Sequence, residues 1–273
     1  MADHAHNKRA TFSQSAIVRG RPIGVITRGT TNINRLRRSD RFLRNDAYIQ
    51  QLLNSTDTPP MAIDVGYGAS YTTTCEWAWW LRKVNPAIQV VGLEIDPARV
   101  LPPRDGVRFE QGGFELAGYQ PQLVRAFNVL RQYDVDQVED AWALVTGRMA
   151  PGGVFIEGTC DEIGRRMTWI DITKEGPQSL TLAWDPQHTD LPSALAERLP
   201  KILIHRNIPG NKIYDLLQAA DAAWNRAAPF APYGPRRRWW EARKFLIADG
   251  VPLMRQPRLY RDNLLRVPWD AVS

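Results

Sequence analysis

The stretch AIDVGYGAS, residues 62–70, combines residue types that can bind an anion. Its apolar start leads to Asp64, and Gly66 and Gly68 follow with one residue between them. A glycine-rich turn after a strand lets the backbone approach a ligand closely, and N–H groups at the start of the next helix favour a phosphate or a carboxylate. The stretch therefore predicts a ligand-binding turn, in which the carboxylate of Asp64 could bind a cationic group of the same ligand.

A second carboxylate indicates a nucleoside. Glu94 directly follows the next apolar run, IQVVGL, and stands 26 residues after Gly68. An acid at the end of the second strand commonly binds ribose hydroxyls. Nicotinamide dinucleotides and S-adenosylmethionine both carry such a ribose. Dinucleotide sites prefer G-x-G-x-x-G, and Tyr71 stands where that pattern has its third glycine, so the sequence favours S-adenosylmethionine.

The surrounding sequence alternates between short apolar runs and amphipathic segments. This pattern predicts an α/β fold with a parallel sheet. The expected strands are 61–65, 88–93, 107–110, 126–130 and 154–159, followed by an antiparallel hairpin of 167–173 and 179–184 around a Gly-Pro turn. The expected helices are 39–54 with Ser39 as N-cap, 71–84, a short one capped by Asp96, 134–149, 193–203, 211–228 and 236–248.

Five segments resemble, in order and spacing, the successive motifs of the class I S-adenosylmethionine-dependent methyltransferases: AIDVGYGAS, VVGLEID, RFEQGGFE, AFNVLRQY and MAPGGVFIEG. The resemblance covers roughly residues 61–185. It implies a Rossmann-like, mostly parallel seven-stranded sheet with a terminal antiparallel hairpin, to which a helical C-terminal cap is added here. It also implies S-adenosyl-L-methionine as cofactor and transfer of its methyl group as the reaction.

Two motifs depart from the usual family pattern. Ser70 replaces the last glycine of the first motif, which leaves a small residue at that position. The third motif reads Gly112-Gly113-Phe114, where the family usually has a glycine followed by an aspartate that meets the adenine amino group. Adenine recognition is therefore expected from the backbone and from stacking on Phe114.

The resemblance implies roles for individual residues. Those expected to bind the methionine, ribose and adenine parts of the cofactor are Asp64, Gly66, Tyr67, Gly68, Ser70, Glu94, Ile95, Gly113 and Phe114. The acceptor pocket is expected at the carboxyl ends of the fourth and fifth strands, where the catalytic candidates are Asn128, Arg131 and Tyr133. Further contacts to the acceptor are expected from Arg28, Thr31, Asn32 and Glu157.

The chain divides by composition into four parts. Residues 1–20 read as a disordered tail, 21–60 as a basic segment and helix that could close over the site as a lid, 61–185 as the cofactor-binding core, and 186–273 as the helical cap. Residues 1–45 carry a net charge of +8, residues 46–233 a charge of −7, and residues 234–273 a charge of +5. The basic ends could bind phosphates or pack on the acidic middle.

Composition narrows the remaining choices. The two cysteines, Cys75 and Cys160, have no metal-ligand spacing, so no metal site is expected, and the chain has neither a secretion signal nor a membrane-spanning run. A cytoplasmic enzyme that methylates an unidentified acceptor of small or middle size is the leading prediction. The alternatives are an RNA methyltransferase that uses the basic ends, a non-catalytic S-adenosylmethionine-binding protein, and a nicotinamide-dependent oxidoreductase, which Tyr71 disfavours. The oligomeric state is left open.

Overall fold

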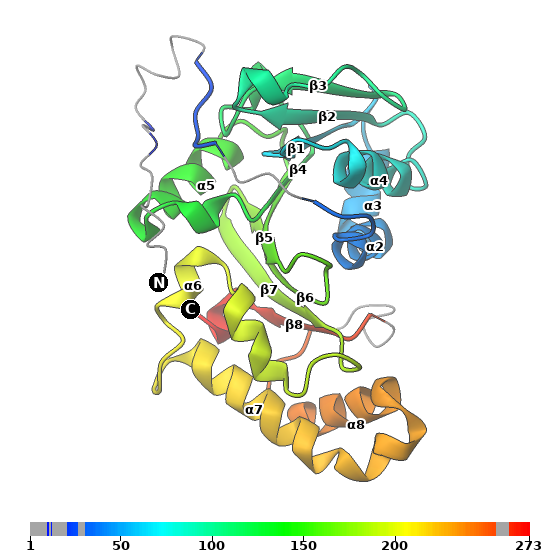
Figure 1. The fold of residues 1–273 in the computed structure, drawn as a ribbon, viewed down its shortest axis with the longest axis vertical. Helices are drawn as coiled ribbons and strands as arrows, with labels where there is room; N and C mark the ends of the chain where they lie inside the picture. Colours follow the sequence, from blue (N-terminus) through cyan, green and yellow to red (C-terminus); the bar gives the residue numbers. More distant parts are fainter. Residues whose placement is uncertain (1–9, 11, 13–20, 27–30, 255–261) are drawn as a thin grey trace.

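One eight-stranded sheet organises the computed structural model, which describes residues 10, 12, 21–26, 31–254 and 262–273 (Figure 1). Five strands run parallel, as the alternating pattern predicts: β1 (Met61–Val65), β2 (Gln89–Glu94), β3 (Val107–Gln111), β4 (Leu123–Phe127) and β5 (Val154–Cys160). Three antiparallel strands extend the sheet beyond β5: β6 (Arg166–Thr173), β7 (Gly176–Trp184) and β8 (Leu264–Pro268).

The order of the strands places a ligand crevice beside β1. The sheet reads β3-β2-β1-β4-β5-β6-β7-β8, so the chain builds outward from β1 to β3 and then returns to the other side of β1 with β4. Open α/β sheets bind ligands beyond the carboxyl ends of the strands, at the point where the strand order reverses. Here that point lies between β1 and β4, and the predicted glycine turn directly follows β1 there.

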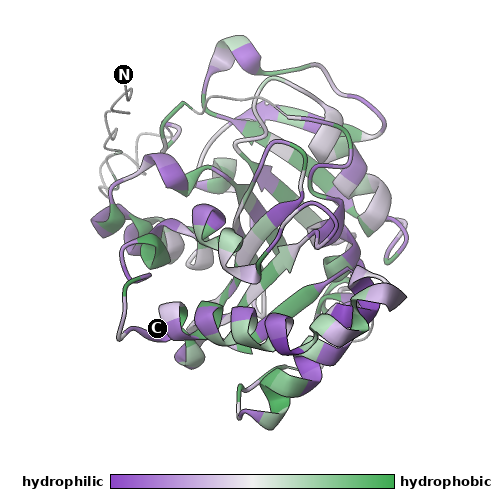
Figure 2. Cartoon of the chain, turned by 60° about the horizontal axis from the view of Figure 1, so that its bottom comes forward, coloured by the Kyte–Doolittle hydropathy of each residue, from purple (hydrophilic) through white to green (hydrophobic). Residues whose placement is uncertain are grey.

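Helices cover both faces of the sheet (Figure 1). On one face, α2 (Arg37–Asn45), α3 (Ala47–Asn54) and α4 (Thr72–Leu81) bury an apolar cluster against the strands. On the other, a second cluster is made by α5 (Val138–Thr146), α6 (Lys201–Ile204), α7 (Lys212–Arg226) and α8 (Pro235–Ala248). Figure 2 shows hydrophilic and hydrophobic residues alternating along these helices, as in amphipathic helices packed on a sheet.

Short 3₁₀ helices make several of the connections. They are η1 (Pro97–Arg99), η2 (Leu116–Gly118), η3 (Leu130–Gln132), η4 (Val135–Gln137), η5 (Pro192–Arg198), η6 (Ala228–Tyr233) and η7 (Trp269–Ala271). Asp96 caps η1, as predicted, by accepting a hydrogen bond from the N–H of Ala98.

Three predicted elements are corrected. The seven-strand prediction is wrong because β8, from the C-terminal region, pairs with β7 and makes an eighth strand. That region is therefore not purely a helical cap. The fourth strand ends at Phe127 and not near residue 130, because Asn128 adopts a left-handed φ of 62° and turns the chain out of the sheet.

The predicted helix 39–54 is in fact two helices. Asp46 between them has extended backbone, and its carboxylate caps α3 by accepting the N–H groups of Tyr48 and Ile49. Ser39 is not an N-cap. It lies inside α2, where its hydroxyl donates to the carbonyl of Leu36.

A fully buried ion cluster joins α2 and α4 to the sheet. Arg125, in β4, donates to both carboxylate oxygens of Asp64 in β1, with Nε–Oδ1 at 3.0 Å and Nη2–Oδ2 at 2.5 Å, and to Oδ1 of Asp40 in α2 at 2.7 Å. Its guanidinium lies over the ring of Trp77 in α4, 4.3 Å from the centroid. Burial raises the pKa of Asp40 to about 8; the charge of Asp64 acts in the same direction and Arg125 acts against it. The cluster therefore holds two carboxyl groups on one guanidinium.

Candidate active site

Five separate segments meet in a small cavity at the carboxyl ends of β1 and β2. Five of the residues predicted to bind the cofactor line it: Gly66, Glu94, Ile95, Gly113 and Phe114. The other lining residues come from the N-terminal segment, β1, the turn after β3 and the chain after β4: Ile23, Gly24, Val25, Val65, Gly112, Val129 and Tyr133. Residues that are far apart in the sequence are thus brought together at the crevice that the strand order predicts.

The glycine turn takes the shape that its sequence predicts. Gly66 and Gly68 have φ values of 71° and 82°, a left-handed conformation that glycine adopts without steric cost. The N–H of Gly66 donates to the carbonyl of Leu93 at 2.7 Å, which fixes the turn against β2. The hydroxyl of Ser70 accepts the N–H of Thr72 at the start of α4. The turn therefore delivers the N-terminus of α4 to the crevice, where a carboxylate is favoured.

Glu94 lies under this turn and is completely buried. Its Oε2 accepts the N–H of Gly68 at 3.0 Å, and its Oε1 accepts the N–H groups of Ile95 and Asp96 at 3.0 and 3.2 Å. A carboxylate offers about four acceptor positions. Three are filled by backbone donors, so a further position on Oε2 can accept a hydroxyl group.

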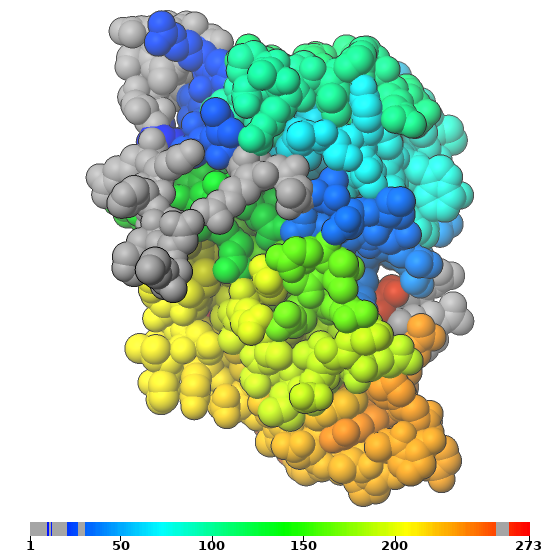
Figure 3. All heavy atoms as spheres, in the orientation of Figure 1, coloured from blue at the N-terminus to red at the C-terminus, as the bar shows by residue number. Residues whose placement is uncertain are grey.

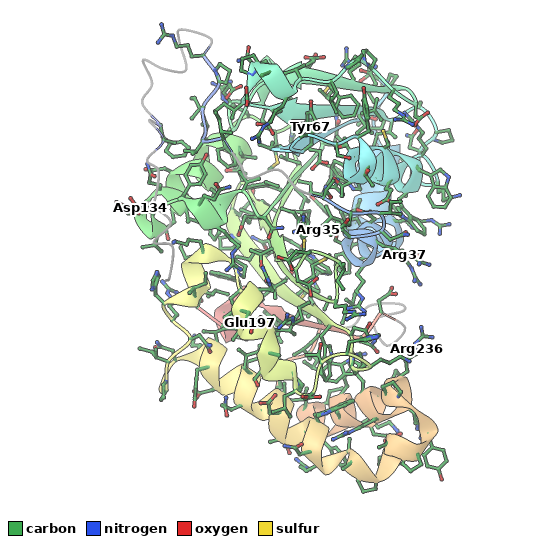
Figure 4. The ribbon with its side chains drawn as sticks, viewed as in Figure 1. Arg35, Arg37, Tyr67, Asp134, Glu197 and Arg236 are labelled. Carbon is green, nitrogen blue, oxygen red and sulfur yellow. The ribbon has the colours of Figure 1, made fainter. Side chains whose placement is uncertain are left out.

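Two predicted cofactor residues direct their side chains elsewhere. Both carboxylate oxygens of Asp64 are bound by Arg125, and Oδ2 also accepts the hydroxyl of Thr74. The hydroxyl of Tyr67 donates to the carbonyl of Arg99 and accepts the N–H of Leu101, which ties the glycine turn to η1 (Figure 4). These two side chains stabilise the turn from behind.

The turn after β3 carries an acid that the sequence reasoning missed. Phe114, which was predicted to stack on adenine, is buried, and its ring packs against Tyr133 at 5.7 Å between centroids. The missed residue is Glu115, whose carboxylate accepts the N–H of Gly113 at 2.8 Å beside the N–H of Phe114. The signal was present in the sequence: the third family motif expects an acid after its glycine, and Glu115 is displaced from that position by only one residue.

On the acceptor side, Asn128, Arg131 and Tyr133 follow β4 as predicted. The Asn128 amide accepts the N–H of Cys160 at 2.9 Å and donates to its thiol at 3.3 Å, so it ties the ends of β4 and β5 together. Arg131 donates to the carbonyl of Glu197 in η5 at 2.7 Å. The hydroxyl of Tyr133 accepts the N–H of Val25 at 2.6 Å, and burial raises the pKa of Tyr133. Tyr133 therefore stays protonated at neutral pH.

Glu157 is the ionisable group with the most unusual surroundings on this side. It lies in β5, with 1% of its surface exposed, and neither carboxylate oxygen has a hydrogen-bond partner among the described residues. Burial raises the pKa of Glu157 to about 8, while the positive charge of Arg131 opposes the rise. A carboxyl group with a pKa near neutrality can accept and release a proton under physiological conditions.

The segment before α2 crosses the strand ends. The Asn32 amide donates to the carbonyl of Glu162, the N–H of Asn34 donates to the carboxylate of Glu76 in α4, and Arg35 Nε donates to the carbonyl of Asp161. Figure 4 labels Arg35 of this segment and Glu197 of η5, which both lie near the middle of the molecule. The segment thus packs against α4 and against the residues that follow β5. Its role as a lid stays a prediction. Thr31 precedes Asn32 in the same segment, whereas Arg28 lies outside the described residues.

Two kinds of feature are absent from the described part of the chain. No group of three or more His, Cys, Asp or Glu side chains there could hold a metal ion. None of its helices has both the length and the apolar character needed to cross a membrane.

Comparison with known proteins gave matches only among solved structures. No protein-family model matches the chain, and no curated protein matches it. The mitomycin 7-O-methyltransferase MmcR is similar over 45% of this chain and 35% of its own, with 15% identity and a TM-score of 0.34. The CcbJ methyltransferase from Streptomyces caelestis is similar over 52% of this chain and 64% of its own, with 14% identity and a TM-score of 0.30. LepI in complex with S-adenosylmethionine is similar over 49% and 33%, with 16% identity and a TM-score of 0.32. The chain thus spans between a third and two thirds of these chains.

Proposed function

We propose that this chain is an S-adenosylmethionine-dependent methyltransferase that acts on an acceptor of small or middle size. The observation that carries the proposal is the convergence of Gly66 in the glycine turn, Glu94 and Phe114 around one cavity. Beside it, Glu94 accepts the N–H of Gly68 and Glu115 accepts the N–H of Gly113. In this proposal Glu94 accepts a ribose hydroxyl, and the start of α4 receives the methionine carboxylate. Ile95 and Phe114 flank the adenine, whose edge meets the N–H of Phe114 and the carboxylate of Glu115.

The cofactor supplies a sulfonium methyl group with a good leaving group already in place. The protein's main contribution is then alignment of the acceptor atom, and orientation effects are worth about 7–11 kcal/mol of barrier. The acceptor gives an electron pair to the methyl carbon, the carbon–sulfur bond pair stays on sulfur, and a protic acceptor must lose its proton. We assign acceptance of that proton to Glu157, because it lies in β5 beside the end of β4, feels the charge of Arg131, and has a pKa raised toward neutral pH.

Other residues of the acceptor side hold the pocket in this proposal. Asn128 fixes the ends of β4 and β5 through its two contacts with Cys160. Arg131 supplies a positive charge beside Glu157 and anchors η5. Thr31 and Asn32 contribute from the lid, which separates the reaction from bulk water. Arg28, which precedes them in the sequence and lies outside the described residues, stays a predicted contact to the acceptor.

Calorimetric titration with S-adenosylhomocysteine tests the cofactor assignment. Glu94→Ala should weaken binding at least tenfold, because it removes the carboxylate that accepts the ribose. The matched variant Asp96→Ala removes a carboxylate two residues away, which caps η1 and pairs with Arg99 at 3.4 Å, and should change the affinity less than threefold.

Two results would contradict the proposal. One is binding of NAD without binding of S-adenosylhomocysteine, which would return the chain to the oxidoreductase alternative. The other is equal loss of affinity in both variants. If neither result is found, transfer of label from methyl-labelled S-adenosylmethionine to a small-molecule fraction would identify the acceptor.

A further inference from the structure

The cavity at the end of β2 is filled by a piece of the chain itself. The N–H of Ile23 donates to Oε2 of Glu115 at 2.6 Å, and the carbonyl of Ile23 accepts the N–H of Phe114 at 2.9 Å. Two residues on, the N–H of Val25 donates to the hydroxyl of Tyr133. The blue residues at the upper left of Figure 3 lie against the teal and green part of the chain that contains these partners. Residues 23–25 are called the plug below.

The walls of the cavity fit the plug closely. A Cβ atom at Gly113 would collide with the carbonyl of Ile23, so only a glycine there leaves room for that peptide group. A Cβ atom at Gly24 would stand 3.2 Å from both the Ile95 side chain and the Tyr133 hydroxyl. The Ile23 side chain is 2% exposed. The plug is therefore bound as specifically as a ligand.

The plug presents the hydrogen-bonding groups of adenine. Adenine carries the N6 amino donor next to the N1 acceptor on its Watson–Crick edge, the edge by which proteins read an unpaired base. The peptide groups of Ile23 present the same pair: the N–H donates to Glu115, and the carbonyl accepts the N–H of Phe114. The two groups that could recognise adenine, the carboxylate of Glu115 and the N–H of Phe114, thus already bind the backbone of Ile23.

The plug and the cofactor cannot occupy the cavity together. With the plug in place, the remaining space is about 10 Å³, enough for roughly one water molecule. On the basis of the proposed function, we propose that residues 23–25 are an autoinhibitory plug that imitates adenine and must leave before the nucleoside of the cofactor binds. The structure then represents the closed state of a two-state device.

The closed state lowers the apparent affinity for the cofactor. When only a fraction of the molecules is open, the apparent dissociation constant equals the intrinsic one divided by that fraction. Any change that expels the plug without touching Glu94, Phe114 or Glu115 should therefore tighten binding. The chain N-terminal to the plug is then a means of control, because a contact that pulls it away would favour cofactor binding.

Two aspartate substitutions in the same segment separate the plug from general effects of charge. Ile23→Asp places a carboxylate at a buried position beside Glu115, so the plug should leave the cavity. Ile26→Asp adds the same charge three residues later, where the side chain is 44% exposed and can stay in water. Titration with S-adenosylhomocysteine should give a dissociation constant at least tenfold lower for Ile23→Asp and within twofold of wild type for Ile26→Asp.

Hydrogen exchange of the unmodified protein provides a second measurement that needs no variant to fold. Saturating S-adenosylhomocysteine should speed exchange of the Ile23 and Val25 amides at least tenfold, while the Phe114 amide stays protected because adenine N1 replaces the carbonyl of Ile23. If wild type binds S-adenosylhomocysteine but the plug amides stay protected and Ile23→Asp binds no better, the plug is refuted and the proposed function stands. If neither wild type nor either variant binds it, the proposed function is refuted, and the plug is refuted with it.

Discussion

At the scale of single residues, burial controls the chemistry of Glu157 more than any partner does. Its two oxygens have no hydrogen bond among the described residues, and the nearest compensation is the charge of Arg131. An unpaired buried carboxylate is costly, and proteins avoid the cost by protonating the group. A residue kept at this cost in β5, the strand next to β4, has the properties expected of a proton acceptor.

The same burial predicts how stability depends on pH. The folded-state pKa of Glu157, about 8, lies above the ordinary value of 4.5, so the folded protein binds more protons than the unfolded chain between these values. The free energy of unfolding should therefore fall as pH rises through this window. Glu157→Gln removes this contribution. The free energy of unfolding of the variant minus that of wild type should therefore rise by a few kcal/mol from pH 5 to pH 9, because each pH unit within the window contributes about 1.4 kcal/mol.

Urea unfolding at several pH values measures the difference between the two proteins. Asp40 also has a raised pKa, but it is present in both, so its contribution cancels. The exposed variant Glu139→Gln should follow the wild-type curve. A constant difference between Glu157→Gln and wild type from pH 5 to pH 9 would show that Glu157 titrates as an ordinary carboxyl group.

At the scale of secondary-structure elements, Arg125 connects more of the fold than any apolar contact of β4. It binds β1 through Asp64 and α2 through Asp40, and it also donates to the carbonyl of Thr73 in α4. Removing one partner of a buried ion pair leaves uncompensated charge and costs about 3–5 kcal/mol. Arg125→Met should therefore lower the free energy of unfolding by that amount.

A surface pair provides the control for this prediction. Arg226 and Asp249 form an ion pair with both side chains nearly half exposed, and exposed pairs contribute about 0–1 kcal/mol. Chemical denaturation of Arg226→Met should give a change within that range. If the two methionine variants lose similar stability, the buried cluster does not hold the helices to the sheet as described.

The elements also show what a sequence can predict. The hairpin β6–β7, the parallel strands β1, β2, β3 and β5 and the glycine turn were predictable, because each depends on local periodicity or on a glycine conformation. The helix break at Asp46 and the early end of β4 depend on single residues with unusual backbone geometry. The edge strand β8 depends on pairing with β7, whose partner residues lie 81–89 positions earlier in the chain, and no local pattern encodes this pairing.

The site divides in the same way. Gly66, Glu94 and Gly113 were found because their roles follow from the end of a strand or from a turn. Asp64 has the residue type of a ligand-binding acid, but Arg125 takes its carboxylate, and that partner stands 61 residues away in the sequence. The plug was predicted only as part of the basic segment 21–60, because its contacts with Phe114 and Glu115 lie about 90 residues from Ile23.

At the scale of the whole molecule, the basic ends pack on acidic partners within the described part of the chain. Arg38 pairs with Asp185 at 3.7 Å, Arg41 with Asp262 at 3.0 Å, and Arg266 with both Asp46 and Asp171. Paired arginines neutralise their own carboxylates and offer less charge to phosphates. Part of the positive charge at the two ends is thus used in ion pairs with other parts of the chain.

This internal pairing predicts weak and unspecific binding of RNA. Non-specific nucleic-acid complexes have dissociation constants of about 10⁻⁴ to 10⁻⁶ M at physiological salt, and their salt dependence grows with the number of phosphates that the protein neutralises. Fluorescence anisotropy with a labelled single-stranded RNA should give no binding tighter than that range at about 150 mM salt. A protein that used both basic ends on RNA would contact roughly six to ten phosphates and lose a factor of about 10³–10⁵ in affinity between 50 and 200 mM salt. That steep loss, together with nanomolar binding at low salt and transfer of labelled methyl to the RNA, would identify RNA as the acceptor class and overturn the assignment to acceptors of small or middle size.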